Sequence, residues 1–138
     1  MAMKDISEVL RAFTAERLVE LWRSTWGAGG PHNKGPINMT QLEELARGLR
    51  ATPPGTDPSV PAGRALHAIT YGRPFWDCNK RTGWTVCFAI MSAMDYALVA
   101  KDEAVERVVL AVENGQLTAE ETAAAVAKLF RAYRAKSR

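Results

Sequence analysis

From Lys80 to about Leu98 the sequence is nearly all apolar, and this stretch limits the folds that are open to the chain. Its large apolar residues are Trp84, Val86, Phe88, Ile90, Met91 and Met94. A helix that is hydrophobic almost all round is buried in the middle of a protein. We therefore expect a central helix over residues 80–98, with the other elements packed around it.

Five further segments carry apolar residues at helical spacing, with start or stop signals at their ends. The first begins after Thr14. Asp102 is expected to cap another, which ends just before Gly115, and Thr118 and Glu121 predict a capping box at the start of the last. The expected helices cover residues 15–26, 39–50, 62–72, 103–114 and about 119–135.

No convincing alternation of period two appears, so the expected fold class is all-α: one helical bundle, spanning residues 1–138 as a single domain. A chain of 138 residues, 47% of them hydrophobic, can bury a core of its own. Gly27–Pro36 and Ala51–Pro61 are rich in glycine and proline and predict loops. The four prolines of the second segment are too many for the interior of a helix. Either loop is a candidate for docking a target.

The charge balance does not indicate a nucleic acid or a membrane as partner. Lys and Arg number 18 against 15 Asp and Glu, a net charge of +3. The basic residues at the end of the chain are typical of a solvated tail; they are Arg131, Arg134, Lys136 and Arg138. The sequence has no run of 18 apolar residues and no signal-peptide core, so we expect a cytoplasmic protein.

The two cysteines and two histidines do not predict a disulfide or a zinc site. Cys78 and Cys87 are nine residues apart on one expected helix, which separates them by about 13 Å along its axis. A disulfide needs Cα atoms within about 7 Å of each other. His32 and His67 are not spaced with the cysteines in a structural-zinc pattern.

Tyr71–Thr82, with the sequence YGRPFWDCNKRT, is the segment that carries chemistry. A helix that begins near Lys80 points its free backbone N–H groups into the preceding loop, where such groups bind anions. Asn79 stands where an N-cap is expected, and Lys80 and Arg81 add cations that cost stability there unless an anion is present. Asp77 suits a magnesium ion that bridges phosphates. These residues predict a polyphosphate site.

The tryptophans of the sequence fall into two groups. Trp22, Trp26 and Trp84 follow the inward faces of their helices and are expected in the core. Trp76 precedes Asp77 in the loop, and it either lines the mouth of the site or serves in packing.

The order PF-x-D-x-NKRT, between one helix and a buried apolar helix, resembles the signature loop of the Fic/Doc family. Its Doc (death-on-curing toxin) branch typically has H-x-F-x-D-[AG]-N-K-R-T. The likeness extends to the order of the helices, the Gly-rich turn and the closing block LAVENGQLTAEE, so it covers nearly the whole chain. It implies a Fic/Doc-like fold, ATP as substrate and Mg²⁺ as cofactor.

The resemblance implies a role for each matching residue. Asp77 matches the acidic residue that holds magnesium on the nucleotide phosphates, and Asn79 matches the asparagine of the anion nest. Lys80 matches a lysine that Doc toxins have where AMP-transferring relatives have glycine. Arg81 matches the arginine that contacts phosphate, and Phe75 matches the aromatic residue that anchors the loop.

Two positions depart from the family pattern. Cys78 occupies the position of a small residue in the phosphate-binding loop, and Arg73 stands where the family has its catalytic histidine. Arginine has no acceptor lone pair and stays charged, so it cannot take a proton from a hydroxyl nucleophile. A general base contributes about 10²–10⁴-fold, although phosphoryl transfer depends less on a base than acyl transfer does. We expect activity to be reduced or lost, with neither His32 nor His67 as a substitute, although Arg73 can itself clamp a phosphate.

Two functions follow as expectations. The first is a Doc-like toxin that transfers phosphate, or less readily AMP, from ATP to a hydroxyl of a translation protein such as elongation factor Tu. The self-inhibitory motif [ST]-x-x-x-E-[GN] of other Fic proteins is absent, since Val109 stands four residues before Glu113. Inhibition would then come from a separate antitoxin-like protein. The second is a catalytically inactive binding or regulatory module of the same fold.

Overall fold

The computed structural model describes residues 5–25 and 36–133. Helices dominate these residues, and one short antiparallel pair of strands completes them. In chain order the elements are α1 (Ile6–Leu10), α2 (Ala15–Ser24), α3 (Met39–Arg50), α4 (Ser59–Thr70), α5 (Asn79–Ala93), β1 (Tyr96–Leu98), α6 (Asp102–Glu113), α7 (Ala119–Leu129) and β2 (Phe130–Ala132). The prediction of a mostly helical protein is confirmed.

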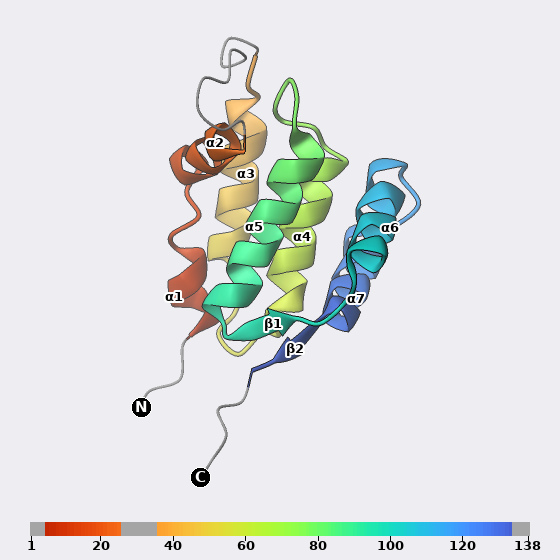
Figure 1. Ribbon diagram of the computed structural model, residues 1–138. Helices are drawn as coiled ribbons and strands as arrows, with labels where there is room; N and C mark the ends of the chain where they lie inside the picture. Colours follow the sequence, from red (N-terminus) through yellow and green to blue (C-terminus); the bar gives the residue numbers. More distant parts are fainter. Residues whose placement is uncertain (1–4, 26–35, 134–138) are drawn as a thin grey trace.

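The helices form a layered bundle (Figure 1). α3, α4 and α5 lie side by side, and α1 and α2 pack against α3 and α5. α6 and α7 pack against α4. The ribbon of β1 and β2 lies at one end of the bundle, and the loop from α4 to α5 lies at the other.

The bundle is built around two helices, α4 and α5, and not around α5 alone. α4 touches α3, α5, α6 and α7 and buries most of its own residues. α5 buries Cys87 and Ile90 but exposes a stripe that includes Arg81 and Phe88, the latter 40% exposed. The expectation of a central helix near Lys80 is therefore met in part: α5 contacts α1, α2, α4, α6 and β1, but it is not buried all round and shares the centre of the bundle with α4.

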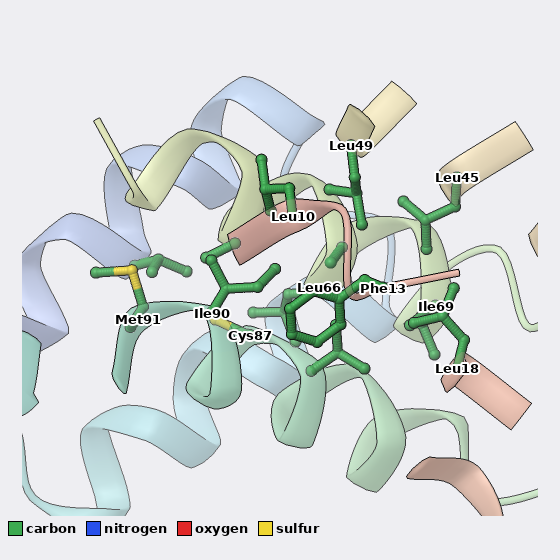
Figure 2. Close-up of a cluster of buried hydrophobic side chains, with 14 of the residues drawn as sticks. Leu10, Phe13, Leu18, Leu45, Leu49, Leu66, Ile69, Cys87, Ile90 and Met91 are labelled. Carbon is green, nitrogen blue, oxygen red and sulfur yellow. The ribbon is translucent and has the colours of Figure 1, made fainter. Parts of the chain in front are cut away.

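The core fills the space between α1, α2, α3, α4 and α5 (Figure 2). Its labelled side chains come from all five helices and from the turn after α1; they are Leu10, Phe13, Leu18, Leu45, Leu49, Leu66, Ile69, Cys87, Ile90 and Met91. Each buried leucine or isoleucine contributes roughly 1.5–3 kcal/mol relative to an exposed one. This core holds the start of α5 in place against α2 and α4.

Local capping signals fixed several helix starts. Thr14 accepts a hydrogen bond from the Arg17 N–H, and Thr118 and Glu121 form the predicted capping box. α3 has its predicted bounds. Asp102 is not an N-cap, because α6 already includes it as its first residue.

Pro61 lies inside α4 and not in the predicted loop. It is the third residue of the helix, and a first-turn residue needs no intrahelical hydrogen-bond donor, so its missing N–H costs nothing there. Asp57 supports this earlier start, because its carboxylate accepts hydrogen bonds from the N–H and the hydroxyl of Ser59. The expected start at residue 62 is therefore three residues too late.

Three other features differ from expectation. α5 ends at Ala93, because Asp95 takes a left-handed backbone conformation with φ of 64°. The chain then forms β1, which pairs with β2 in the register Tyr96–Ala132 to Leu98–Phe130, so α7 ends at Leu129 and not near residue 135. α1 was not predicted. Five-residue helices and three-residue strands are too short to show a period in the sequence.

Some predictions fall outside the described residues. They concern the core position of Trp26, the loop Gly27–Pro36 with His32, and the basic residues Arg134, Lys136 and Arg138. Among the helices that are described, none has the length and apolar content needed to cross a membrane.

Gly63 sets the distance between α4 and α7. A Cβ built at this position would lie 2.4 Å from the Ala123 Cα atom. We expect Gly63→Ala to lower the free energy of unfolding by about 1–3 kcal/mol, since backbone atoms of α7 must move away. Urea denaturation measures the change. Gly48→Ala is the matched control, because its Cβ would meet only the flexible Arg64 side chain. Equal effects of the two changes would contradict this explanation.

Candidate functional site

The loop between α4 and α5 lies beside the C-terminal ends of α2 and α6. It runs from Tyr71 to Cys78, at the end of the bundle opposite the β ribbon (Figure 1). The C-terminal end of α2 reaches the loop through Trp22 and the first turn of α5 through Thr25, and the C-terminal end of α6 reaches that same turn through Glu113. Residues from four parts of the chain thus form one site.

Phe75 anchors the loop in the core, as expected. Its side chain is 3% exposed and stacks on Trp22, with ring centroids 4.8 Å apart and the planes within 7° of parallel. The Trp22 indole Nε1–H also donates a hydrogen bond of 2.9 Å to the Asp77 backbone carbonyl. Ile37 forms an isolated antiparallel bridge with Phe75. The aromatic pair therefore fixes the backbone immediately before α5.

Asn79 holds the loop together from inside. Its side-chain oxygen accepts from the Phe75 N–H at 3.0 Å, and its side-chain amide donates to the Phe75 carbonyl at 2.8 Å. The residue is 6% exposed. Asn79 is not the predicted N-cap: it is the first residue of α5, and both polar groups of its side chain bind Phe75. Its contribution to an anion nest is limited to its backbone N–H.

Cys78 is the N-cap residue of α5, with a left-handed backbone at φ 60° and ψ 30°. Its own side chain makes no capping hydrogen bond. The first N–H that bonds within the helix is that of Thr82, which donates to the Cys78 carbonyl at 3.0 Å. The N–H groups of residues 79–81 precede it and have no partner inside the helix. α5 thus presents the positive end of its dipole to the loop.

A cavity of about 320 Å³ lies at this helix start. Its lining consists of six predicted site residues and of Glu113, which was not predicted; the six are Arg73, Asp77, Cys78, Asn79, Lys80 and Arg81. Small-molecule sites typically have volumes of about 300–1,000 Å³. The cavity contains three cations and two carboxylates, so it can hold a small anion together with a metal ion.

The charged groups of the cavity have distinct partners. The Lys80 Nζ atom lies 3.5 Å from the Glu113 carboxylate, and the Arg81 guanidinium donates to the Thr25 carbonyl at 3.0 Å. The Asp77 carboxylate accepts a hydrogen bond of 2.7 Å from the Cys78 N–H. Each of these side chains is held near the helix start by a neighbour.

Arg73 lines the cavity but cannot act as the family's base does. It takes a left-handed conformation with φ of 54°, and its N–H donates to the Ile69 carbonyl at 3.1 Å. His67 offers no substitute, since it packs against Tyr71 in a tilted arrangement, with ring centroids 5.4 Å apart, and does not line the cavity. Trp76 is 36% exposed and is also absent from the lining.

Sequence reasoning missed Glu113 as a site residue. The sequence indicates that it stands at the end of a helix, before Gly115, but not that this end faces the loop. Only the packing of α6 against α4 and α5 brings the carboxylate to Lys80. Trp22 and Thr25 were missed in the same way, because their contacts with the loop lie more than fifty residues apart in the chain.

The donor set fits a magnesium ion that is shared with a phosphate. In the described part of the chain no group of three or more His, Cys, Asp or Glu side chains could hold a metal. Magnesium bound to nucleotides keeps several waters and uses only one or two carboxylates plus phosphate oxygens. Asp77 beside an uncapped helix start meets that requirement.

The two cysteines differ in accessibility. Cys87 is fully buried, and burial raises the pKa of its thiol to about 12. Cys78 is partly exposed and lines the cavity. Both are free, in agreement with the sequence prediction.

Comparison of the sequence with protein-family models finds no match, and comparison with curated proteins finds none either.

Removal of the Asn79 side chain should loosen the site. Asn79→Ala leaves the buried N–H and carbonyl of Phe75 without partners, at about 1–3 kcal/mol for each group. We expect the free energy of unfolding to fall by about 2–6 kcal/mol, measured by urea denaturation. Asn38→Ala is the control, because Asn38 caps an exposed helix start and should cost about 1 kcal/mol. A smaller loss for Asn79→Ala than for Asn38→Ala would contradict the role of Asn79.

Proposed function

We propose that this protein is a Doc-like phosphotransferase that binds ATP with Mg²⁺ and transfers phosphate, less readily AMP, to a hydroxyl of a translation protein. The observation that carries the proposal is the cavity at the uncapped start of α5, where Arg73, Lys80 and Arg81 surround free backbone N–H groups beside Asp77. Cations at this end of a helix oppose its dipole, so the arrangement favours a bound anion. A polyphosphate with a metal ion satisfies all of these groups.

Each residue of the cavity has a task in the proposal. Lys80 and Arg81 would hold phosphate oxygens together with the N–H groups of residues 79–81, and Asp77 would hold the magnesium. The metal would neutralise charge that develops on the phosphates. Phe75 and Asn79 would keep the loop rigid, since a misplacement of about 1 Å can cost 10²-fold in rate.

The resemblance to the Doc branch supplies the target and the partner in this proposal. Elongation factor Tu is the target expected from the family, with an antitoxin-like protein as inhibitor and the cytoplasm as location. Lys80 in place of glycine favours transfer of phosphate over transfer of AMP. The Fic/Doc-like identity of the bundle belongs to the same proposal.

Arg73 favours a second candidate, a catalytically inactive module that binds nucleotide or an antitoxin-like peptide. This residue adds a third cation to the cavity and removes the family's proton acceptor. Binding would then be strengthened while catalysis is lost. Both candidate functions allow the cavity to bind the nucleotide, and only the first includes transfer of its phosphate.

Bound Mg·ATP should shield the thiol of Cys78. In the native protein at neutral pH we expect a thiol reagent to modify one cysteine per chain, Cys78, because burial keeps the Cys87 thiol protonated and inaccessible. Millimolar Mg·ATP should slow this modification at least several-fold, and the ratio with and without ligand is the measurement. Asp77→Ala should reduce the protection. Equal rates of Cys78 modification with and without Mg·ATP would contradict the proposal that the cavity binds this nucleotide.

Restoring the histidine separates the enzyme from the binding module. We expect Arg73→His to raise the transfer of labelled phosphate from ATP to purified elongation factor Tu by about 10²-fold if no other residue serves as the base, and by less than about tenfold if another residue already does. Gel-based label counting measures the rate, with Arg73→His/Asp77→Ala as the control. Labelling by the variant and none by the parent chain would favour the inactive module. No labelling by either would contradict the Doc-like activity.

A further inference from the structure

Glu113 is a carboxylate in the cavity that the proposed phosphate and metal contacts do not use. It is the last residue of α6, and its side chain is 27% exposed. It lines the cavity together with residues of the loop and the first turn of α5. Its Oε1 atom lies 3.5 Å from the Lys80 ammonium. A helix distant in the sequence thus adds a second carboxylate to the cavity, beside the cation Lys80.

The lining has few groups that can accept a proton. Arg73, Lys80 and Arg81 have no free lone pair when charged, and the amide of Asn79 is fully engaged with Phe75. The sulfur of Cys78 is a weak acceptor. Asp77 bonds to the Cys78 N–H and is the proposed ligand of the metal. Glu113 is the remaining carboxylate of the lining.

We propose that Glu113 is the general base that replaces the family's histidine, an inference that rests on the proposed phosphotransferase function. When phosphate oxygens engage Lys80, the ammonium is shared, and the Glu113 carboxylate beside it becomes free to accept a proton. The hydroxyl to be deprotonated would attack a phosphate whose oxygens Lys80 holds, and Glu113 is the carboxylate in contact with Lys80. A carboxylate serves this role in protein kinases.

The step balances without a further reactant. The oxygen of the acceptor hydroxyl forms a bond to the γ-phosphorus of ATP, and its proton passes to the Glu113 carboxylate. The bond between the γ-phosphorus and the bridging oxygen breaks, and ADP leaves with the electron pair. The proton on Glu113 then passes to solvent, to which the side chain is partly exposed.

The test compares Glu113→Gln and Glu113→Asp with the parent chain. Glu106→Gln is the matched control, an exposed glutamate on the same helix that does not line the cavity. Calorimetry gives the Kd for Mg·ATP, and γ-labelled ATP with elongation factor Tu, or with water alone, gives kcat. We expect Glu113→Gln to lower kcat by about 10²-fold with Kd unchanged or tighter, and Glu113→Asp to retain part of the rate.

A second test introduces the Glu113 change into the Arg73→His variant. In Arg73→His, Glu113→Gln should cost less than about tenfold in kcat, because the histidine then supplies the base. An unchanged or higher kcat in Glu113→Gln would overturn the assignment and leave Glu113 as a counterion of Lys80. A parent chain that binds Mg·ATP without turnover would overturn it as well. A chain that fails to bind Mg·ATP would overturn the proposed function itself.

Discussion

The paired hydrogen bonds between Asn79 and the backbone of Phe75 are the interaction on which the site depends. They lie in the interior, where water cannot compete for the donor and the acceptor, so leaving either unpaired is costly. The stacked rings of Phe75 and Trp22 complete the same anchor. Together these contacts fix the position at which α5 begins, and thereby the direction of its first N–H groups.

Two cations of the cavity have partners on neighbouring elements, which the proposed ligand would have to displace. Lys80 and Arg81 stand where the helix dipole repels cations, and both have partners that offset the repulsion, the Glu113 carboxylate and the Thr25 carbonyl. These partners lie on other helices and are partly exposed, so each contact is weak. In the proposed function, a phosphate oxygen would replace either partner at low cost.

The sequence predicts those features that depend on neighbouring residues. The bounds of α3 and the Thr118 capping box follow from local patterns, and so does the gathering of Asp77, Lys80 and Arg81 at a helix start. Contacts between distant residues could not be predicted, since nothing near Glu113 or Trp22 in the chain indicates the loop. The role of Asn79 was misjudged because capping and loop closure favour the same residue type.

The β ribbon brings together the two ends of the segment that carries Glu113, because β1 precedes α6 and β2 follows α7. Pairing of Tyr96–Leu98 with Phe130–Ala132 joins the two ends of the chain segment that contains α6 and α7. A cut in the turn between these helices would leave each half tethered to the body by its own strand. The segment is therefore tied to the bundle twice, at its two ends through the paired strands and along its length through the packing of α6 and α7 against α4.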